Sequence, residues 1–279
     1  RRRPDLRMVD KDGTAIEKAS YAYPEVRDYM LSMIREVAEG YDIDGVHLCF
    51  NRGPQFVGYE DIVIKDFKAE YGIDPRELDE NDIRAQRQRA SYLTEFVRSA
   101  RKLVNEVGQK KGKKIELSAM IYPATVNGRE WNLFFGFDFP TWFEEELLDN
   151  VFMDLAGKPF PLDPKIVEMA HSHNCKFIAN ISGNPSRVVK LVQDNFKAGV
   201  DGLSFWDFGD GSENPEKWQV YRRIGHKEEV DAFVNSMPKI KTIRLKTVGG
   251  FDVSHPTNKG VGKMSFKRPP EMMPFYSGG

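Results

Sequence analysis

A short phrase that occurs twice constrains the fold of this chain most strongly. Residues 41–50 and residues 198–207 each follow a helical stretch, turn at Asp44-Gly45 or Asp201-Gly202, and continue into a short apolar strand. In a β/α barrel, a helix returns the chain to the next parallel strand in this way. Barrel enzymes place their chemistry at the carboxyl ends of the strands. The residues that follow each copy are therefore the first candidates for a functional site.

Strand and helix patterns alternate along the chain, which favours a parallel sheet. Apolar spacing predicts helices at 24–39, 86–107, 140–148, 164–173 and 186–197, and strands at 45–50, 115–122, 151–155, 175–181 and 202–207. Residues 6–10 look like the end of one more strand. We expect an α/β fold of the (β/α)8 TIM-barrel type, incomplete at the N-terminus and holding about the last five to six β/α units.

The domain organisation follows from the same pattern. Residues 1–236 are expected to form the partial barrel, with a long loop over 51–85 that contains a short helix at 62–71. Two further short helices are predicted at 215–224 and 227–236. Residues 237–279 are predicted to be a C-terminal extension, with an edge strand at 241–248 and a poorly ordered, irregular tail rich in Pro and Gly.

Composition narrows the classes of function. The chain has 279 residues and a net charge of -1, so no global field attracts nucleic acid or an anionic membrane, and no apolar run is long enough to span a bilayer. Cys49 and Cys175 are read as buried free thiols. His171 and His173 lie at a helix end entering a strand, on the side opposite the expected site, so we expect no metal and no cofactor there. His47 is read as a hydrogen-bonded structural residue.

The strand ends collect polar and aromatic side chains that suit a glycan. Amides and carboxylates bond pairs of hydroxyls, and ring faces stack on sugars. Glycoside cleavage needs two carboxyl groups, and Asp154 and Asp207 form the best pair. The expected substrate-binding residues are Asn51, Arg52, Tyr122, Asn180, Trp206, Asp210 and Trp131.

Structural roles compete with these functional ones. Asp154 and Asp207 could instead cap the helices that follow them, and Asp210 could be a turn residue. Arg52 could pin the long loop through a salt bridge, and Trp131 could pack on the rim.

The segment 23–37, together with Asp44-Gly45 and Asp10 to Gly13, resembles the glycosyl-hydrolase-like family ten domain, a family of glycosidase-like proteins of bacterial envelopes. The resemblance implies a TIM barrel that lacks its amino-terminal strands here, often within an exported or periplasmic protein. The family commonly has an acidic residue at the end of the strand after Asp-Gly, whereas this strand ends at Phe50-Asn51.

Two readings of function stay open. The first is a glycoside hydrolase acting on a poly- or oligosaccharide, and the second is a non-catalytic barrel that binds glycans or serves as a scaffold. A barrel isomerase or aldolase would need a Lys at an inward strand end, and Lys176 instead begins its strand. The substrate glycan, the oligomeric state and the compartment do not follow from the sequence.

Overall fold

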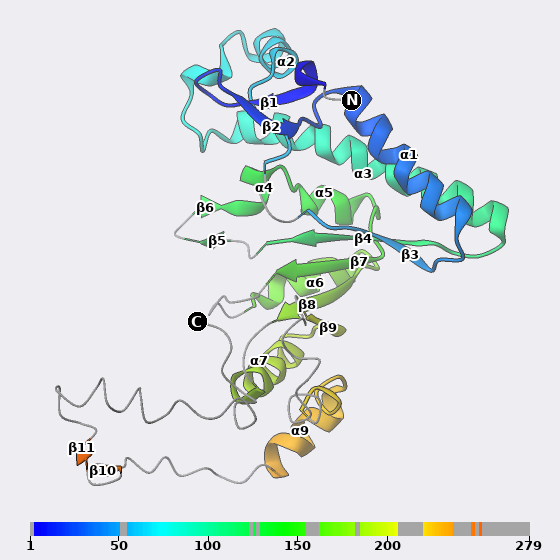
Figure 1. Ribbon diagram of the computed structural model, residues 1–279, viewed down its shortest axis with the longest axis vertical. Helices are drawn as coiled ribbons and strands as arrows, with labels where there is room; N and C mark the ends of the chain where they lie inside the picture. The colour runs from blue at the N-terminus through cyan, green and yellow to red at the C-terminus, as the bar shows by residue number, and fades with distance from the viewer. Residues whose placement is uncertain are drawn as a thin grey trace. The chain divides into compact units, whose positions relative to one another are not determined.

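The computed structural model describes residues 3–50, 55–122, 125–126, 129–154, 162–181, 185–205, 220–236, 247–248 and 251–252 (Figure 1). The chain divides into two compact units. The first comprises residues 1–182 with 194–205, and the second comprises residues 183–193 with 206–279. The predicted domain boundary at 236/237 stays a prediction.

A five-stranded parallel sheet forms the centre of the first unit. Its strands are β3 (Gly45–Leu48), β4 (Glu116–Ile121), β7 (Asn150–Asp154), β8 (Lys176–Ile181) and β9 (Gly202–Phe205). They lie side by side in chain order, and every neighbouring pair is parallel. The predicted α/β fold with a parallel sheet is therefore confirmed, and the two copies of the Asp-Gly phrase lead into the first and last strands.

Four helices of the first unit form a layer on one face of the sheet. The α-helices are α1 (Pro24–Gly40), α2 (Asp61–Tyr71), α3 (Ile83–Lys111), α4 (Trp131–Phe135), α5 (Phe139–Glu144), α6 (Pro164–Ser172), α7 (Pro185–Lys197) and α9 (Lys227–Ser236), with short 3-10 turns at Pro4–Leu6 and Pro75–Glu77. Contacts run in succession from α1 to α3, α5 and α6, while α3 touches β4 and α6 touches β8. These four helices therefore form one layer.

The core lies between this helical layer and the sheet. Alternate strand residues such as Leu117, Ile121 and Phe177 are completely buried. Trp142 of α5 is also fully buried, and its indole N–H donates to Thr94 Oγ1 at 2.9 Å. The alternation of strand side chains thus places one set in the core and the other on the opposite face, as predicted for 115–122.

Helix α3 is longer than its predicted range of 86–107. Asp82 caps its first turn by accepting from Arg84 N at 3.0 Å, so the helix starts at Ile83. Gly108, read from the sequence as the stop, lies inside the helix against the carbonyl of Lys113. The helix ends at Gly112 instead, whose φ of 69° provides the left-handed cap.

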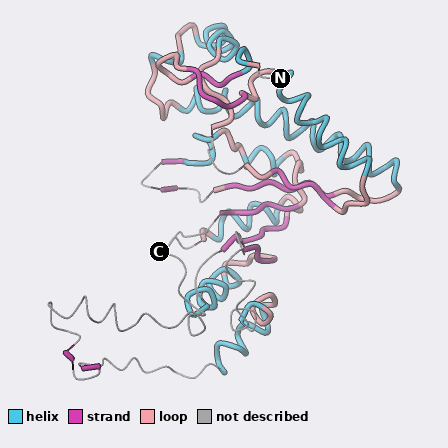
Figure 2. The backbone as a smooth tube through the Cα atoms, viewed as in Figure 1, coloured by secondary structure: helices cyan, strands magenta, loops and turns pink. Residues whose placement is uncertain are grey.

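The amino-terminal strand does not join the parallel sheet. Strand β1 (Arg7–Val9) pairs antiparallel with β2 (Ala15–Ala19), and this hairpin lies beside α2 and the start of α3 (Figure 2). The turn between them uses Gly13 at a φ of 87°. Strand β2 is almost wholly exposed and has no alternation of apolar and polar residues, so the sequence pattern did not predict it as a strand. Two further hairpins are β5 (Thr125–Val126) with β6 (Arg129–Glu130), and β10 (Thr247–Val248) with β11 (Phe251–Asp252).

One side of α1 is uncovered among the described residues. Its apolar side chains Met33 and Val37 are exposed, as is Tyr29 at 65%. Val26 of the same helix is buried. The helix packs on α3 along one side only, so its apolar surface is wider than the contact that α3 provides.

Aspartates that precede strands tie each of those strands to its neighbour. Asp149, just before β7, accepts from Leu117 N of β4 at 2.8 Å. Asp201, just before β9, accepts from Phe177 N of β8 at 2.7 Å. In both cases the aspartate also donates its own backbone N–H to the carbonyl of the same partner residue. Each aspartate therefore fixes the register of its strand against the previous one.

The second unit is described only in part. Helix α9 matches its predicted range of 227–236, and Gln193 Nε2 of α7 donates to Asp231 Oδ1 at 2.9 Å. Most of the predicted helix at 215–224 and of the edge strand at 241–248 lies outside the described residues, as does nearly all of the tail.

Candidate functional site

The strand register brings three of the predicted site residues into one row. Asp154, the last residue of β7, is paired with Asn180 of β8, and Asn180 is paired with Ser204 of β9. On the other side, Ile121 is paired with Met153, so Tyr122 lies next to Asp154. The four side chains, Tyr122, Asp154, Asn180 and Ser204, share the face of the sheet that is turned away from the helical layer. We call them the strand-end row.

Tyr122 is held firmly at the end of β4. Its backbone N–H donates to Asn132 Oδ1 at 2.8 Å, and Asn132 Nδ2 donates back to the Tyr122 carbonyl at 2.7 Å. Its ring stacks on Phe137, with centroids 5.9 Å apart and planes 8° from parallel. Phe135 meets the same ring edge-on at 5.4 Å. These contacts fix the position of the phenol relative to the strand ends.

The chemistry of Tyr122 is that of a donor. Burial, together with the negative charges that Asp154 and Cys49 can carry, raises the pKa of Tyr122 to about 12. The phenol is therefore protonated throughout the neutral range and can donate to an oxygen. Beside it, Asp154 is half-buried and supplies a carboxylate at the strand end.

Asn180 carries an acceptor that no described residue satisfies. Its side chain is 1% exposed, and Oδ1 has no hydrogen-bond partner within the part of the chain that the structure describes. A buried polar atom left without a partner costs about 1–3 kcal/mol, so such atoms are rare away from functional positions. Its place between Asp154 and Ser204 makes it suited to accept from a ligand hydroxyl.

Three side chains earlier in β3, β4 and β7 contact one another. His47 Nδ1 and Ser118 Oγ share a hydrogen bond of 2.9 Å, and the imidazole meets the Phe152 ring at 4.6 Å. Burial lowers the pKa of His47, so its ring is neutral near pH 7. The predicted hydrogen-bonded role of His47 is therefore found.

The remaining predicted residues divide into two groups. Asn51, Arg52, Trp206, Asp207 and Asp210 lie outside the described residues. Trp131 begins α4, and only its backbone is described. The predicted pairing of Asp154 with Asp207 therefore stays a prediction.

Sequence reasoning missed Ser204 and misjudged Cys49. Ser204 is two residues before the predicted site residue Trp206 in the sequence, so the two-residue period of a strand could have identified it. Cys49 was expected to be buried, but it is exposed, whereas Cys175 is buried as predicted, and both are free thiols. The strand β3 ends at Leu48, so Cys49 lies beyond the last residue that the sheet covers.

The histidines near Cys175 have partners of their own. His171 Nε2 lies 2.8 Å from Asp201 Oδ2, at the helix end that leads into β8. Within the described ranges, no group of three or more His, Cys, Asp or Glu side chains is arranged to hold a metal ion. None of the helices described is both long and apolar enough to cross a membrane.

Comparison with known families and structures agrees with this geometry. The model of the family Glycosyl hydrolase-like 10 matches residues 8–182, more than half of the chain. This chain belongs to that family. The match begins at β1 and ends just after β8, so it contains Tyr122, Asp154 and Asn180.

Two solved structures share the fold. The glycoside hydrolase domain of PgaB (BpsB) from Bordetella bronchiseptica aligns with a TM-score of 0.54 at 12% identity, over 78% of this chain and 69% of that domain. A beta-galactosidase from the psychrophilic Marinomonas ef1 aligns with a TM-score of 0.52 at 11% identity, over 84% of this chain and 47% of that one. No curated protein matches the sequence. The family and these neighbours together support a protein of the glycoside hydrolase type.

Proposed function

We propose that this chain carries the active face of a glycoside hydrolase that cleaves a poly- or oligosaccharide by carboxylate acid–base chemistry. The observation that carries the proposal is the strand-end row. Asp154 lies there between a phenol donor and an unsatisfied amide acceptor, at the carboxyl end of a parallel sheet. Hydroxyl-rich ligands need this mixture of donors and acceptors, and barrel enzymes react at this end.

The roles follow from the chemistry of each group. Asp154 serves as one of the two carboxyl groups, and Asp207 serves as the other. Tyr122 donates to a glycan oxygen, and Asn180 accepts from a glycan hydroxyl. Asn51, Arg52, Asp210, Trp131 and Trp206 are proposed to position the sugar from the surrounding loops.

The alternative function is glycan binding without cleavage. One observation favours it: the segment after β3 carries Cys49, Phe50 and Asn51, so this strand end contributes no carboxylate. A barrel whose acid pair is incomplete would still bind sugars through the strand-end row.

Asp154→Asn separates the two functions. If the chain is a hydrolase, this variant should lose at least about a hundredfold in turnover, because general acid or base catalysis contributes about 10²–10⁴-fold. Release of reducing ends from a broad glycan panel measures turnover, and calorimetry measures binding. Asp163→Asn is the matched control: Asp163 caps α6 by accepting from Lys165 N, and Asn caps equally well.

The outcomes are distinct. Lost turnover with retained binding in Asp154→Asn, beside a normal control, supports the hydrolase. Binding without any turnover in the wild type supports the binder. Wild-type turnover in Asp154→Asn refutes the role of Asp154.

We also infer that β3 is paired on its open side, as an incomplete barrel requires. Asp44 precedes β3 as Asp149 and Asp201 precede β7 and β9, but its side chain is 103% exposed and contacts only Lys113 among the described residues. Before β7 and β9, the equivalent carboxylate accepts a hydrogen bond from a backbone N–H of the previous strand. Asp44 therefore occupies the position that clamps a parallel strand against the open edge of β3.

The exposed apolar side of α1 supports the same inference. A β/α unit added beside β3 would place its helix next to α1, where Tyr29, Met33 and Val37 are uncovered. Thermal melts of Asp44→Ala and Asp201→Ala in the full-length polypeptide test it. Equal falls in melting temperature support the pairing of β3, whereas no fall for Asp44→Ala contradicts it.

A further inference from the structure

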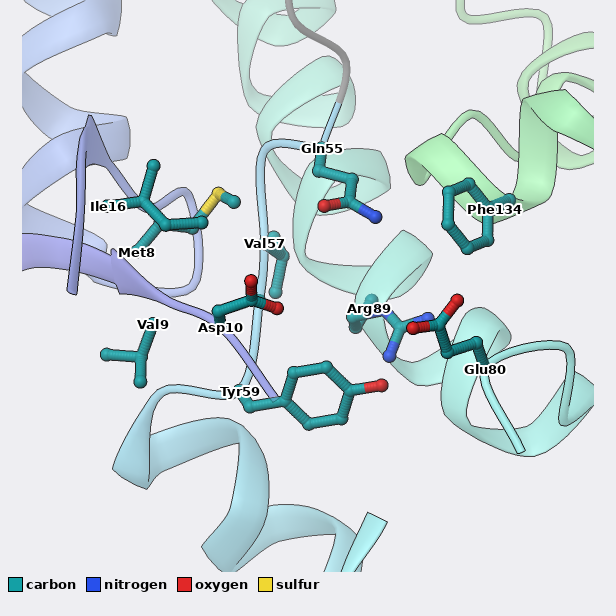
Figure 3. Close-up of a pocket in the computed structure, with 11 residues that line it drawn as sticks. Met8, Val9, Asp10, Ile16, Gln55, Val57, Tyr59, Glu80, Arg89 and Phe134 are labelled. Atoms are coloured by element: carbon teal, nitrogen blue, oxygen red, sulfur yellow. The ribbon is translucent and has the colours of Figure 1, made fainter. Parts of the chain in front are cut away.

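A small polar cavity lies apart from the strand-end row, between strand β1, the segment 55–59 and helices α3 and α4. Its volume is about 30 Å³, and the residues that matter for its chemistry are Arg89, Tyr59, Gln55, Asp10, Glu80 and Phe134 (Figure 3). This space holds about two water molecules. A planar carboxylate group fits it, whereas a whole sugar ring does not.

Arg89 is the unusual feature of the cavity. The side chain is 5% exposed, and its guanidinium lies over the Tyr59 ring at 5.2 Å from the centroid. No acceptor or carboxylate in the described part of the chain forms a hydrogen bond or salt bridge with it. A guanidinium buried without a carboxylate partner gains from any acceptor that reaches it. The Arg89 N–H groups are therefore available to a ligand that enters the cavity, next to the Asp10 and Glu80 carboxylates that also line it.

Other donors point to the same space. Figure 3 shows the amide of Gln55 and the hydroxyl of Tyr59 directed into the cavity with the Arg89 guanidinium. Gln55 has a φ of 99°, a conformation that non-glycine residues rarely adopt, and this conformation places its side chain there. Three converging donors form a binding site for an oxyanion.

The carboxylates of Asp10 and Glu80 do not prevent an oxyanion from binding next to Arg89. Both are exposed at the rim of the cavity, where water screens their charge. Arg89 lies deeper, where screening is weak.

The cavity is linked to the strand-end row by two ring contacts. Phe134 lines the cavity and meets Phe135 at 5.5 Å, and Phe135 meets Tyr122 at 5.4 Å.

We propose that this cavity binds the carboxylate of an acidic sugar, so that the substrate is a glycan bearing uronic acid residues. Arg89 takes the two carboxylate oxygens through its parallel N–H groups, and Gln55 and Tyr59 donate the remaining bonds. The proposal rests on the proposed function for its choice of a glycan, but carboxylate binding itself requires no turnover.

Binding measurements on Arg89→Gln test the proposal. Calorimetry compares an oligosaccharide of glucuronic acid with the neutral glucose oligosaccharide of the same linkage and length. The wild type should bind the acidic ligand more tightly, and Arg89→Gln should weaken that binding at least tenfold while affinity for the neutral ligand stays within about twofold. Free acetate is the third ligand and measures the carboxylate contribution without the sugar.

Arg84→Gln is the matched control. Arg84 lies on the same helix and also over a tyrosine ring, that of Tyr71 at 5.7 Å, but it is exposed and already paired with Asp82 at 2.7 Å. This variant should bind both glycans as the wild type does. If Arg89→Gln does not fold, Arg89→Lys serves instead. This variant keeps the positive charge but loses the two parallel N–H groups, so its affinity for the acidic glycan should fall severalfold.

Three results would overturn the proposal: equal wild-type affinity for acidic and neutral glycans, equal loss of both in Arg89→Gln, or an unchanged acidic affinity in a folded Arg89 variant. Asp154→Asn should retain the preference for the acidic ligand. A failure of the hydrolase proposal is therefore distinguishable, since it appears in turnover and leaves this preference intact.

Discussion

Asp149→Ala tests how strongly the aspartate clamps stabilise the sheet. The Asp149 carboxylate accepts from Leu117 N at 2.8 Å and pairs with Arg101 at 2.6 Å and Lys114 at 2.5 Å. The side chains of Asp149 and Arg101 are 16% and 12% exposed. Removing the carboxylate would leave the Leu117 N–H without its side-chain acceptor and Arg101 without this carboxylate, although Arg101 Nε still donates to the Leu147 carbonyl at 2.8 Å.

The magnitude follows from these contacts. The lost charge-assisted bond to Leu117 N contributes about 1.5–3 kcal/mol, and the partly buried pair with Arg101 adds about 1 kcal/mol. The Lys114 side chain is 67% exposed, so its share is small. We expect a loss of about 2–4 kcal/mol in the free energy of unfolding, or a fall in melting temperature of about 5–15 °C for a chain of this size.

The effect should also depend on pH. Burial pushes the pKa of Asp149 upward, but the bonds from Lys114, Leu117 N and Arg101 outweigh it and hold the pKa below the usual 3.8. A lowered pKa means that the stabilisation is present above about pH 4 and is lost as the pH falls through the folded value. The difference between the wild type and Asp149→Ala should therefore shrink in acid.

Calorimetric melts of both proteins at pH 7 and pH 3 measure these values. Asp42→Ala is the control, because Asp42 is 92% exposed and pairs only with Lys113 among the described residues. It should melt as the wild type does. If Asp149→Ala falls no further than Asp42→Ala at pH 7, the clamp does not stabilise the sheet as reasoned.

Two further predictions concern the docking of the amino-terminal hairpin. Gly58→Ala would place a Cβ 2.2 Å from the carbonyl oxygen of Val9, so the free energy of unfolding should fall by about 1–3 kcal/mol or more. Gly40→Ala is the control, because its Cβ meets nothing within 4 Å and the variant should melt as the wild type does. An unchanged melting temperature for Gly58→Ala would contradict the close approach. Glu60 is fully buried and accepts from Val9 N and Gly58 N, and burial raises its pKa above 4.5 in spite of those bonds. This contribution of Glu60 to stability is then full only below pH 4.5 and is lost as the pH rises through the folded pKa. The wild type should therefore lose melting temperature relative to Glu60→Gln between about pH 3.5 and pH 8, and parallel curves would refute this.

The sequence predicted the parallel sheet well because its signals are local. The Asp44-Gly45 and Asp201-Gly202 turns lie where strands begin, and the alternation in 115–122 correctly divides the core side chains from those of the opposite face. Both signals depend on neighbouring residues only, since the two-residue period of a strand is set by its own backbone. Strand ends could therefore be identified, and Tyr122, Asp154 and Asn180 with them.

Long-range contacts were beyond the reach of the sequence. The hairpin of β1 and β2 has no apolar alternation, and its place depends on contacts such as that of the buried Glu60 carboxylate, which accepts from the backbone N–H of Val9, 51 residues away.

The sequence by itself located the five strands of the parallel sheet, because backbone periodicity and turn chemistry act over a few positions. Only the tertiary structure decided that Asp154, Asn180 and Ser204 form one row, since register depends on hydrogen bonds between strands. The burial of Arg89 was also decided only by the tertiary structure, because the segments that surround its side chain are far apart in the chain.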